Sequence, residues 1–322
     1  MAAEPPEVPS VGTQVTLRVA TPVGPISVVG EIVAADAEHW SVRRRDGQVA
    51  EVAVASIEAR RVVPPGRSAT TSAQEIEQLA AFGWRAVETA RLGEWLLRAS
   101  GGFTQRANSA LAIGDPGVEL DRAIELVSDW YAERDLPALV MQPDGLGPEG
   151  LPERLAERGW RARSETLVMT GEVAHALRAM PDAVAAASSG LTLRLDDAPD
   201  DAWYAGYAES RATSQAARQV IETHPSVVFA SLRDGVRAVA VARAAVDARW
   251  TGLAAVTVAP ERRRQGLGAA VTLAALKEAA RRGGRHVYLQ VEADNDPAIA
   301  LYRRLNLRPH HGYRYWAPPS SK

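Results

Sequence analysis

Short runs of alternating apolar and polar residues fill the first sixty or so positions of the chain. Each run has the two-residue period of a half-exposed strand, and the runs cover residues 15–19, 26–34, 40–44 and 49–54. The Asp46-Gly47 pair and the segment 22–25 between them are typical of turns. The pattern over residues 11–63 predicts a small β-barrel, to which we assign no chemistry because a fold does not fix a function.

Helical periodicity begins after a linker of residues 64–72. Ser72 followed by Glu75 is a capping-box pattern that predicts the start of a helix, and the helical stretch is expected to run over residues 73–99. Beyond it, helices alternate with short apolar strands such as 108–113, which is typical of the α/β (α+β) class.

The same order of elements occurs twice, in residues 73–180 and again in residues 191–318, with a joint near residues 180–190. In both parts a strand, a longer helix, a second strand, a short helix and a third strand follow one another. The ends of the two short helices align when residues 155–160 are placed over residues 302–307. We predict a tandem duplication, although two unrelated stretches could also share this order.

The composition narrows the classes of function. A length of 322 residues predicts two or three domains, and 46% hydrophobic with 24% charged residues is typical of a folded chain. A net charge of −2 gives no general attraction to nucleic acid or to membranes, and no signal peptide or spanning segment is evident, so a cytoplasmic location is expected. The absence of cysteine excludes thiol nucleophiles, and the histidines lack metal-ligand spacing, so we expect no metal.

One stretch concentrates positive charge at the junction of a strand and a long helix, over residues 256–269. The first N–H groups of a helix lack carbonyl partners and attract anions, and Gly266 and Gly268 let a phosphate approach the backbone. Three arginines, 262–264, add local charge. A nucleotide-hydrolase loop is excluded because no lysine follows the glycines, and a dinucleotide loop is excluded because Val271 stands at its third glycine position.

Together with Asn295 and Tyr302 downstream, this stretch closely resembles the GCN5-related N-acetyltransferase (GNAT) family. The family pattern V-x-P-x-x-R-x-x-G-x-G corresponds to residues 258–268, and N-x-x-A-x-x-L-Y corresponds to residues 295–302. The resemblance implies tandem GNAT folds with mixed central sheets, and the small barrel that the pattern of residues 11–63 predicts ahead of them is SH3-like. It also implies acetyl-CoA as the donor of an acetyl group to an amine.

The resemblance also assigns roles to residues. It implies that acetyl-CoA is bound by Val256, Val258, Arg263, Arg264, Gln265, Gly266, Leu267, Gly268, Ala269 and Asn295. Tyr302 would donate a proton to the departing thiolate. The general base stays open between Glu292 and Glu222, and His286, His310 or His311 could relay protons.

The first half lacks these features. Its strand 108–113 leads into a turn with Asp115 and Glu119, whose carboxylates would repel phosphate, and Leu155 stands where the second half has Tyr302. We therefore expect only the second half to be catalytic, with the first half forming one wall of the acceptor pocket.

The arrangement of the whole chain is similar to that of an actinobacterial-type N-acetylglutamate synthase, in part because of residues 102–109. This similarity suggests L-glutamate as the acceptor and a place in arginine biosynthesis, with its carboxylates held by arginines among Arg211, Arg218, Arg243 and Arg249. The alternatives are another amine, namely an amino sugar, a mycothiol precursor or a protein N-terminus, or a non-catalytic acyl-CoA sensor. The oligomeric state is left open, a homo-oligomer included.

Overall fold

The computed structural model describes residues 14–21, 25–44, 48–62, 71–184, 190–207 and 214–319, in two compact units, residues 1–71 and 72–322. The predicted turn at Asp46-Gly47 lies outside the described residues, as do most of the predicted linker 64–72 and part of the joint 180–190. Within the described part, no helix is long and apolar enough to cross a membrane.

The first unit is a five-stranded antiparallel sheet in the order β4-β3-β2-β1-β5. Its strands are β1 (Gln14–Val19), β2 (Ile26–Ala35), β3 (His39–Arg44), β4 (Val49–Ala53) and β5 (Ile57–Val62), with a 3-10 turn η1 (Val54–Ser56) between the last two. Leu17, Ile32 and Trp40 are fully buried in its core, because alternate residues of each strand point inward. The strands follow the predicted runs, whereas the SH3-like classification stays a prediction.

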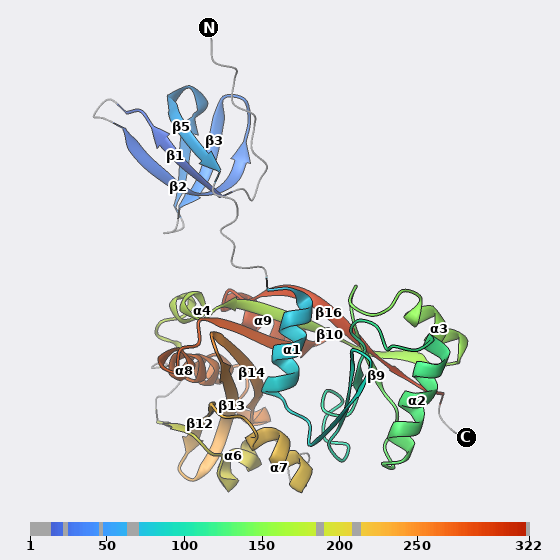
Figure 1. Ribbon diagram of the computed structural model, residues 1–322. Helices are drawn as coiled ribbons and strands as arrows, with labels where there is room; N and C mark the ends of the chain where they lie inside the picture. Colours follow the sequence, from blue (N-terminus) through green and yellow to red (C-terminus); the bar gives the residue numbers. More distant parts are fainter. Residues whose placement is uncertain are drawn as a thin grey trace. The chain divides into compact units, whose positions relative to one another are not determined.

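The second unit is built on one eleven-stranded mixed sheet, in the order β11-β12-β13-β14-β15-β10-β16-β9-β8-β7-β6 (Figure 1). Its strands are β6 (Glu88–Leu92), β7 (Trp95–Ala99), β8 (Ala110–Leu111), β9 (Val140–Pro143), β10 (Arg161–Glu172), β11 (Thr192–Asp196), β12 (Val227–Asp234), β13 (Arg237–Asp247), β14 (Trp250–Val258), β15 (His286–Glu292) and β16 (Arg308–Ala317). Its helices are α1 (Ala73–Gly83), α2 (Leu120–Ala132), α3 (Leu151–Glu157), α4 (Val173–Ala179), α6 (Asp201–Tyr207), α7 (Gln215–Glu222), α8 (Leu267–Arg281) and α9 (Asp296–Arg304), with a 3-10 turn η2 (Pro260–Arg262). The mixed α/β class with a large mixed sheet is confirmed.

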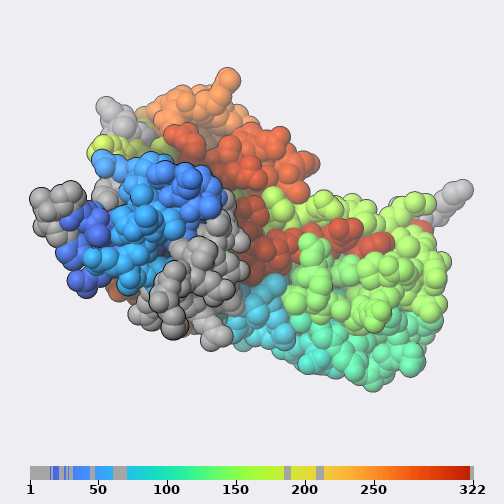
Figure 2. Space-filling view, turned by 90° about the horizontal axis from the view of Figure 1, so that it is seen from above, coloured from blue at the N-terminus to red at the C-terminus, as the bar shows by residue number. Residues whose placement is uncertain are grey.

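At the centre of the sheet, the last strand of each half pairs with a strand of the other half. β10, at the end of the first half, pairs with β15 of the second half, and β16, at the end of the second half, pairs with β9 of the first. β10 and β16 also pair with each other. In Figure 2 the red surface of the C-terminal segment accordingly adjoins the green surface of the first half. Each half keeps one parallel pair, β8 with β9 and β14 with β15.

The helices cover both faces of the second half of the sheet. On one face α4, α8 and α9 pack over alternate β15 residues such as Val287, Leu289 and Val291. On the other face α1 packs beside Tyr288, and α6 and α7 pack over neighbouring strands. Figure 1 shows α2 and α3 at the opposite end of the sheet from α6, α7 and α8. The alternation along β15 places Gln290 and Glu292 on the same face as Tyr288.

The ends of α3 and α9 have the same hydrogen bonds. The Trp160 N–H donates to the Leu155 carbonyl over 2.9 Å, and the Leu307 N–H donates to the Tyr302 carbonyl over 3.0 Å. Gly159 and Asn306, which follow the two helices, both have left-handed backbones. The alignment of residues 155–160 with residues 302–307 therefore describes two equivalent helix ends, which is consistent with a duplication.

Two predicted elements are wrong. The helix expected over residues 73–99 ends at Gly83, and β6 and β7 form a hairpin instead, because Gly93 at φ 54° permits a tight turn and Trp95 is buried. The strand expected over residues 108–113 is confined to Ala110–Leu111. Three further strands, β11, β12 and β13, were not predicted at all.

Candidate active site

A β-bulge interrupts β14 shortly before its end. The pairing of β14 with β13 shifts there, leaving one extra residue in β14, and Ala255 has a left-handed backbone with φ 56°. The side chains of Ala254 and Ala255 therefore both pack on the side of α6 and α7, whereas Val256 and Val258 pack on the side of α8. Bulges of this kind change the direction of a strand and often lie beside active sites.

The parallel strands β14 and β15 separate at this bulge. Their pairing extends only to Leu253 and Leu289, and beyond that point β15 is paired with β10 on its other side. Residues 254–258 of β14 thus have a backbone edge that β15 does not cover. An extended ligand with its own amide groups could hydrogen-bond to such an edge as an additional strand does.

The turn from β14 into α8 presents a series of unpaired backbone donors. Among the residues that the structure describes, the N–H groups of residues 264–269 have no hydrogen-bond partner. Arg264 and Gly266 both have left-handed backbones, and Gly266 begins the helix without a side-chain cap. Since the helix dipole adds positive potential at the same place, the turn is suited to bind phosphate oxygens.

The three arginines of this turn differ in their surroundings. Arg262 forms an ion pair with Asp234 at 3.1 Å, so its charge is compensated. Arg263 and Arg264 are exposed and have no carboxylate partner within the described part of the chain. All three arginines place charge at the turn, and two of the guanidinium groups, those of Arg263 and Arg264, have no compensating carboxylate within the described residues.

The remaining residues assigned to acetyl-CoA are shared between exposed and buried positions. Gln265 is exposed, and its side-chain nitrogen lies 3.4 Å from the Glu261 carbonyl, whereas Leu267 and Ala269 are buried. At Gly268 a Cβ atom would lie 3.4 Å from the Leu301 side chain and 3.6 Å from that of Val258. Gly268 thus lies against both α9 and the end of β14.

Asn295 is the N-cap residue of α9. Its side-chain oxygen accepts a hydrogen bond from the Ala298 N–H over 3.2 Å, and the side chain is exposed. The cap orients α9, the helix that carries Tyr302, relative to the end of β15. The NH2 group of Asn295 makes no hydrogen bond to a described residue and is available to a bound molecule.

Tyr302 is buried on the inner face of α9, with 7% of its surface exposed. Burial raises the pKa of its phenol above the usual value, so the hydroxyl stays protonated at neutral pH. It makes no hydrogen bond to any described residue. A protonated hydroxyl without a protein partner is available to donate to a bound molecule.

A polar cavity of about 620 Å³ lies on the opposite face of the sheet, where the strands have separated. It is lined by Gln290 and Glu292 of β15, by residues 101–106 of the first half, and by Ser164, Thr166, Ser214, Tyr313 and Tyr315. Glu292 is exposed and reaches this space from the same face of β15 as Gln290. The first half therefore forms one wall of the cavity.

Comparison with known proteins defines the family of this chain. Residues 70–316 match the family described as "Probable histone acetyltransferase Rv0428c C-terminal". The chain is also 34% identical over 322 residues to "Probable histone acetyltransferase Rv0428c" of Mycobacterium tuberculosis, covering 95% of both chains. The chain belongs to this GNAT acetyltransferase family.

Other members and neighbours of the GNAT family agree with this fold. The "Uncharacterized N-acetyltransferase YobR" of Bacillus subtilis is 27% identical over 75% of the chain and 97% of its own length. A solved GCN5-related N-acetyltransferase from Kribbella flavida, 22% identical, superposes with a TM-score of 0.60 over 77% of the chain and 96% of that structure. A tandem GNAT protein from clavulanic acid biosynthesis superposes with a TM-score of 0.51 over 77% of the chain and 89% of that structure, at 17% identity.

In this GNAT chain Glu222 is separated from the cavity that Glu292 lines. It lies at the end of α7, where its carboxylate accepts a short hydrogen bond from the Tyr204 hydroxyl, and it is exposed. Burial and this bond raise the pKa of Tyr204. Tyr204 itself lines a second cavity, together with Arg218, Val258 and Arg263. The two carboxylates named as candidate bases thus belong to different surroundings.

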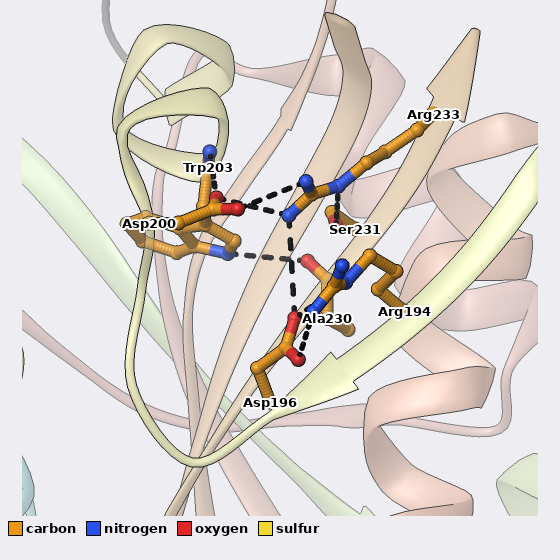
Figure 3. A network of polar contacts seen from close by, with 7 residues as sticks. All are labelled: Arg194, Asp196, Asp200, Trp203, Ala230, Ser231 and Arg233. Atoms are coloured by element: carbon orange, nitrogen blue, oxygen red, sulfur yellow. Dashed lines mark hydrogen bonds and ion pairs between the residues drawn. The ribbon is translucent and has the colours of Figure 1, made fainter. Parts of the chain in front are cut away.

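A network of charged residues fixes the start of α6 in this half (Figure 3). The Arg233 guanidinium donates two hydrogen bonds of 2.9 Å to Asp200, and the Trp203 N–H donates to the same carboxylate. The Trp203 indole also donates to the Ala230 carbonyl over 3.1 Å. The Arg233 guanidinium holds the pKa of Asp200 below its ordinary value. The network therefore holds the start of α6, the helix that carries Tyr204, against β12.

The predicted acceptor arginines are scattered. Arg249 is exposed at the β13–β14 turn, at the opposite end of β14 from the α8 turn, and Arg211 lies outside the described residues. Arg218 stacks on Tyr204 with its Cζ 4.2 Å from the ring centroid. Arg243 is buried in β13, where its Nε and Nη1 donate to the carbonyls of Ile221 and Gly83.

The histidines stand apart from the phosphate-binding turn. His286 packs on Trp250 with ring centroids 5.0 Å apart, at the start of β15. The His311 Nε2 lies 2.8 Å from a buried Glu77 carboxylate, and its Nδ1 faces His310. No group of metal-ligating side chains occurs among the residues that the structure describes.

Sequence reasoning missed a cluster beside the polar cavity, consisting of Trp84, Arg106 and Gln290 together with Arg243. The Arg106 guanidinium lies 4.9 Å from the centroid of the Trp84 ring. It also donates a short hydrogen bond to the side-chain oxygen Oε1 of Gln290. Arg243 lies 5.3 Å from the same ring. Arg243 was among the arginines expected to hold the acceptor, and Arg106 stands within the segment 102–109 noted above, whereas Trp84 and Gln290 had no sequence signal.

Proposed function

We propose that the second half of this acetyltransferase moves an acetyl group directly from acetyl-CoA to an amine. The observation that carries the proposal is the turn from β14 into α8, where consecutive N–H groups lack partners beside Arg263 and Arg264. The separation of β14 from β15 supports it, because it leaves a free backbone edge that leads from this turn toward the interior of the sheet.

The residues divide the chemistry between them. The N–H groups of residues 264–269 would hold the pyrophosphate, and the free edge of β14 near Val256 and Val258 would hold the pantetheine amides and the acetyl oxygen. As the amine nitrogen bonds to the acetyl carbon, the carbon–sulfur bond breaks and the thiolate takes the phenolic proton of Tyr302.

The attacking amine must also lose a proton. Glu292 lines the polar cavity and has no ion-pair partner within the described residues, so we assign it the role of base, acting directly or through water. Glu222 is the weaker candidate, since its carboxylate is already hydrogen-bonded to Tyr204. A non-catalytic acyl-CoA sensor would not need a proton donor, whereas the Tyr302 hydroxyl is protonated and has no hydrogen-bond partner among the described residues.

The acceptor is the finer part of the proposal. The relatives bear names that refer to different acceptors, histones for the Mycobacterium tuberculosis protein and mycothiol for a Clavibacter sepedonicus enzyme that is 46% identical over 63 residues. That second match covers only 20% of the chain. L-Glutamate, suggested by the sequence, has no support from these names, and we keep it as one member of the panel below.

Isothermal titration with acetyl-CoA, followed by a thiol-release assay with a panel of amines, tests the proposal. The panel contains L-glutamate, other amino acids, glucosamine, polyamines and a histone tail peptide. We expect one binding site per chain and thiol release that depends on at least one amine. Tight acetyl-CoA binding without release on any of them would instead favour a sensor.

A further inference from the structure

Positive charge gathers along one side of the polar cavity. Arg106 lines the cavity, and neither it nor the nearby Arg243 has a carboxylate partner within 4.0 Å among the described residues. Both guanidinium groups lie against the Trp84 ring, at 4.9 and 5.3 Å from its centroid. Two positive charges that lie against the same aromatic ring repel each other, so a negative charge beside them would be stabilised.

The same cluster has unpaired hydrogen-bond donors. The Nε of Arg106, the Nη2 of Arg243 and the Nε2 of Gln290 are buried and have no partner. Arg243 is the most enclosed of the three, with only 1% of its surface exposed. An unpaired buried donor is destabilising, and Arg106 and Gln290 both line the cavity, so their side favours a group that accepts hydrogen bonds.

Burial lowers the pKa of Arg243 to about 10, and the charge of Arg106 acts in the same direction. Arg243 still carries its charge at neutral pH. Its Nε and Nη1 hold the C-terminal carbonyls of α7 and α1, over 2.7 and 2.8 Å, so it cannot turn toward another partner. Arg243 therefore contributes a fixed positive charge behind the cavity, and Arg106 is the guanidinium that a ligand can reach.

The negative charge of the cavity lies on β15, at Glu292. Gln290, which contacts Arg106, and Glu292 are alternate residues of β15 and line the same cavity, so their Cα atoms are about 7 Å apart. The cavity thus has a cationic end at Arg106 and an anionic end at Glu292. A molecule that carries both an ammonium and a carboxylate would match both ends.

We propose that the acceptor of this enzyme is an amine that also carries a carboxylate, and that Arg106 binds this carboxylate while the amine lies toward Glu292. The assignment rests on the proposed function for the role of the amine, but the carboxylate site follows from the cavity alone. It makes Arg106, supplied by the first half, a residue that determines specificity. The first half would then select the molecule that the second half acetylates.

The test compares acids with the amines that remain when the carboxylate is removed. L-Lysine and cadaverine, L-phenylalanine and phenethylamine, and L-leucine and isoamylamine are titrated into the full-length protein in the presence of CoA. A charge-assisted hydrogen bond is worth about 1.5–3 kcal/mol, so we expect the acid of at least one pair to bind roughly 10-fold or more tightly than its partner. Equal binding within every pair, or tighter binding of the amines, would overturn the proposal.

Two variants locate the effect. Arg106→Gln should remove the preference for the acid, whereas Arg134→Gln, which removes a guanidinium stacked 3.8 Å from the Trp130 ring in the first half, should keep it. If Arg106→Gln does not fold, the wild-type comparison still decides whether a carboxylate is recognised. A preference that survives in folded Arg106→Gln would contradict the role of Arg106.

Turnover separates this inference from the proposed function. If both hold, thiol release should favour the acids through KM, and Arg106→Gln should raise KM with little change in kcat. Binding of the acids without any release would contradict the proposed function and leave the carboxylate site standing. Release that is equally fast with acids and with their decarboxylated partners would contradict the carboxylate site and leave the proposed function standing.

Discussion

The turns that follow β8 and β14 occupy equivalent places in the two halves, yet their backbone donors differ. After β14 the N–H groups of residues 264–269 are unpaired. After β8 the Asp115 N–H donates to the Glu94 carboxylate over 2.6 Å, and the Gly117 N–H donates to the Asp115 carboxylate over 2.7 Å. The turn of the first half thus carries carboxylates that accept hydrogen bonds from its own N–H groups, whereas among the described residues no carboxylate accepts from the N–H groups of residues 264–269.

The helices that follow these turns continue the contrast. α2 begins with Leu120 and Asp121, and α8 begins with Leu267 and Gly268, so an aspartate stands where the second half has glycine. Asp121 is held by Arg158 at 3.1 Å, as part of a surface ion-pair cluster. α2, like α8, begins without a side-chain cap, so the two turns differ mainly in the carboxylates of Glu94, Asp115 and Asp121, which would repel an anion at the start of α2.

The largest expected effect comes from giving the second half the aspartate of the first. Gly268→Asp places a carboxylate at the second residue of α8, where it would compete with phosphate for the same N–H groups. We expect acetyl-CoA affinity to fall by roughly 100-fold or more, which corresponds to about 2.7 kcal/mol, by isothermal titration. The matched change Asp121→Gly should leave the affinity unaltered. Wild-type affinity in Gly268→Asp would contradict the assignment of the turn.

Tyr302→Phe separates chemistry from binding in the second half. Loss of the proton donor should lower kcat by roughly 10- to 100-fold, with the dissociation constant of acetyl-CoA within about twofold of wild type. Stability should hardly change, because the hydroxyl has no hydrogen-bond partner among the described residues.

The control for Tyr302→Phe is a buried tyrosine of the first half. The Tyr131 hydroxyl donates to the Arg98 carbonyl over 2.9 Å, so Tyr131→Phe should cost about 1 kcal/mol of unfolding free energy in urea and spare kcat. If both variants lose activity alike, Tyr302 has no special role.

A smaller effect distinguishes the arginines of the active turn. Arg264→Asn removes an unpaired charge but suits the left-handed backbone at this position, so we expect acetyl-CoA to bind about three- to tenfold more weakly and with a shallower dependence on salt. Arg262→Gln removes a charge that Asp234 already compensates, and affinity should stay within about twofold. Equal losses would show that the ion pair opens when the ligand binds.

The smallest effect concerns the turn after β8. Glu94→Gln removes the charge of the carboxylate that receives the Asp115 N–H, at an exposed position, so chemical denaturation should report a loss of at most about 1 kcal/mol. Acetyl-CoA binding and turnover should not change. A change in acetyl-CoA affinity would mean that the first half takes part in donor binding.

Local signals were sufficient for the active turn and its neighbours. The long helix expected at the end of the stretch 256–269 is observed over Leu267–Arg281. It depends on glycines, caps and apolar periods that are adjacent in the sequence. The family was likewise evident from short motifs around Gly268 and Tyr302.

Features that depend on distant residues were not predictable. The sequence predicts helix over the hairpin of β6 and β7, because these residues continue the pattern of α1. The hairpin is stabilised by the burial of Trp95, which depends on the rest of the sheet. The exchange of β10 and β16 between the halves leaves no trace in local periodicity. Arg106 and Gln290 are 184 positions apart, so their contact has no sequence pattern.

The central claim is that the chain binds acetyl-CoA at one of its two equivalent turns, through backbone N–H groups that are unpaired in the free protein. Amide hydrogen exchange with and without acetyl-CoA measures these groups directly. Exchange at residues 264–269 should be fast in the free protein and slow strongly on binding, while residues 113–121 remain unchanged. Bound acetyl-CoA that protects the first turn, or that leaves residues 264–269 exchanging as before, would contradict the account.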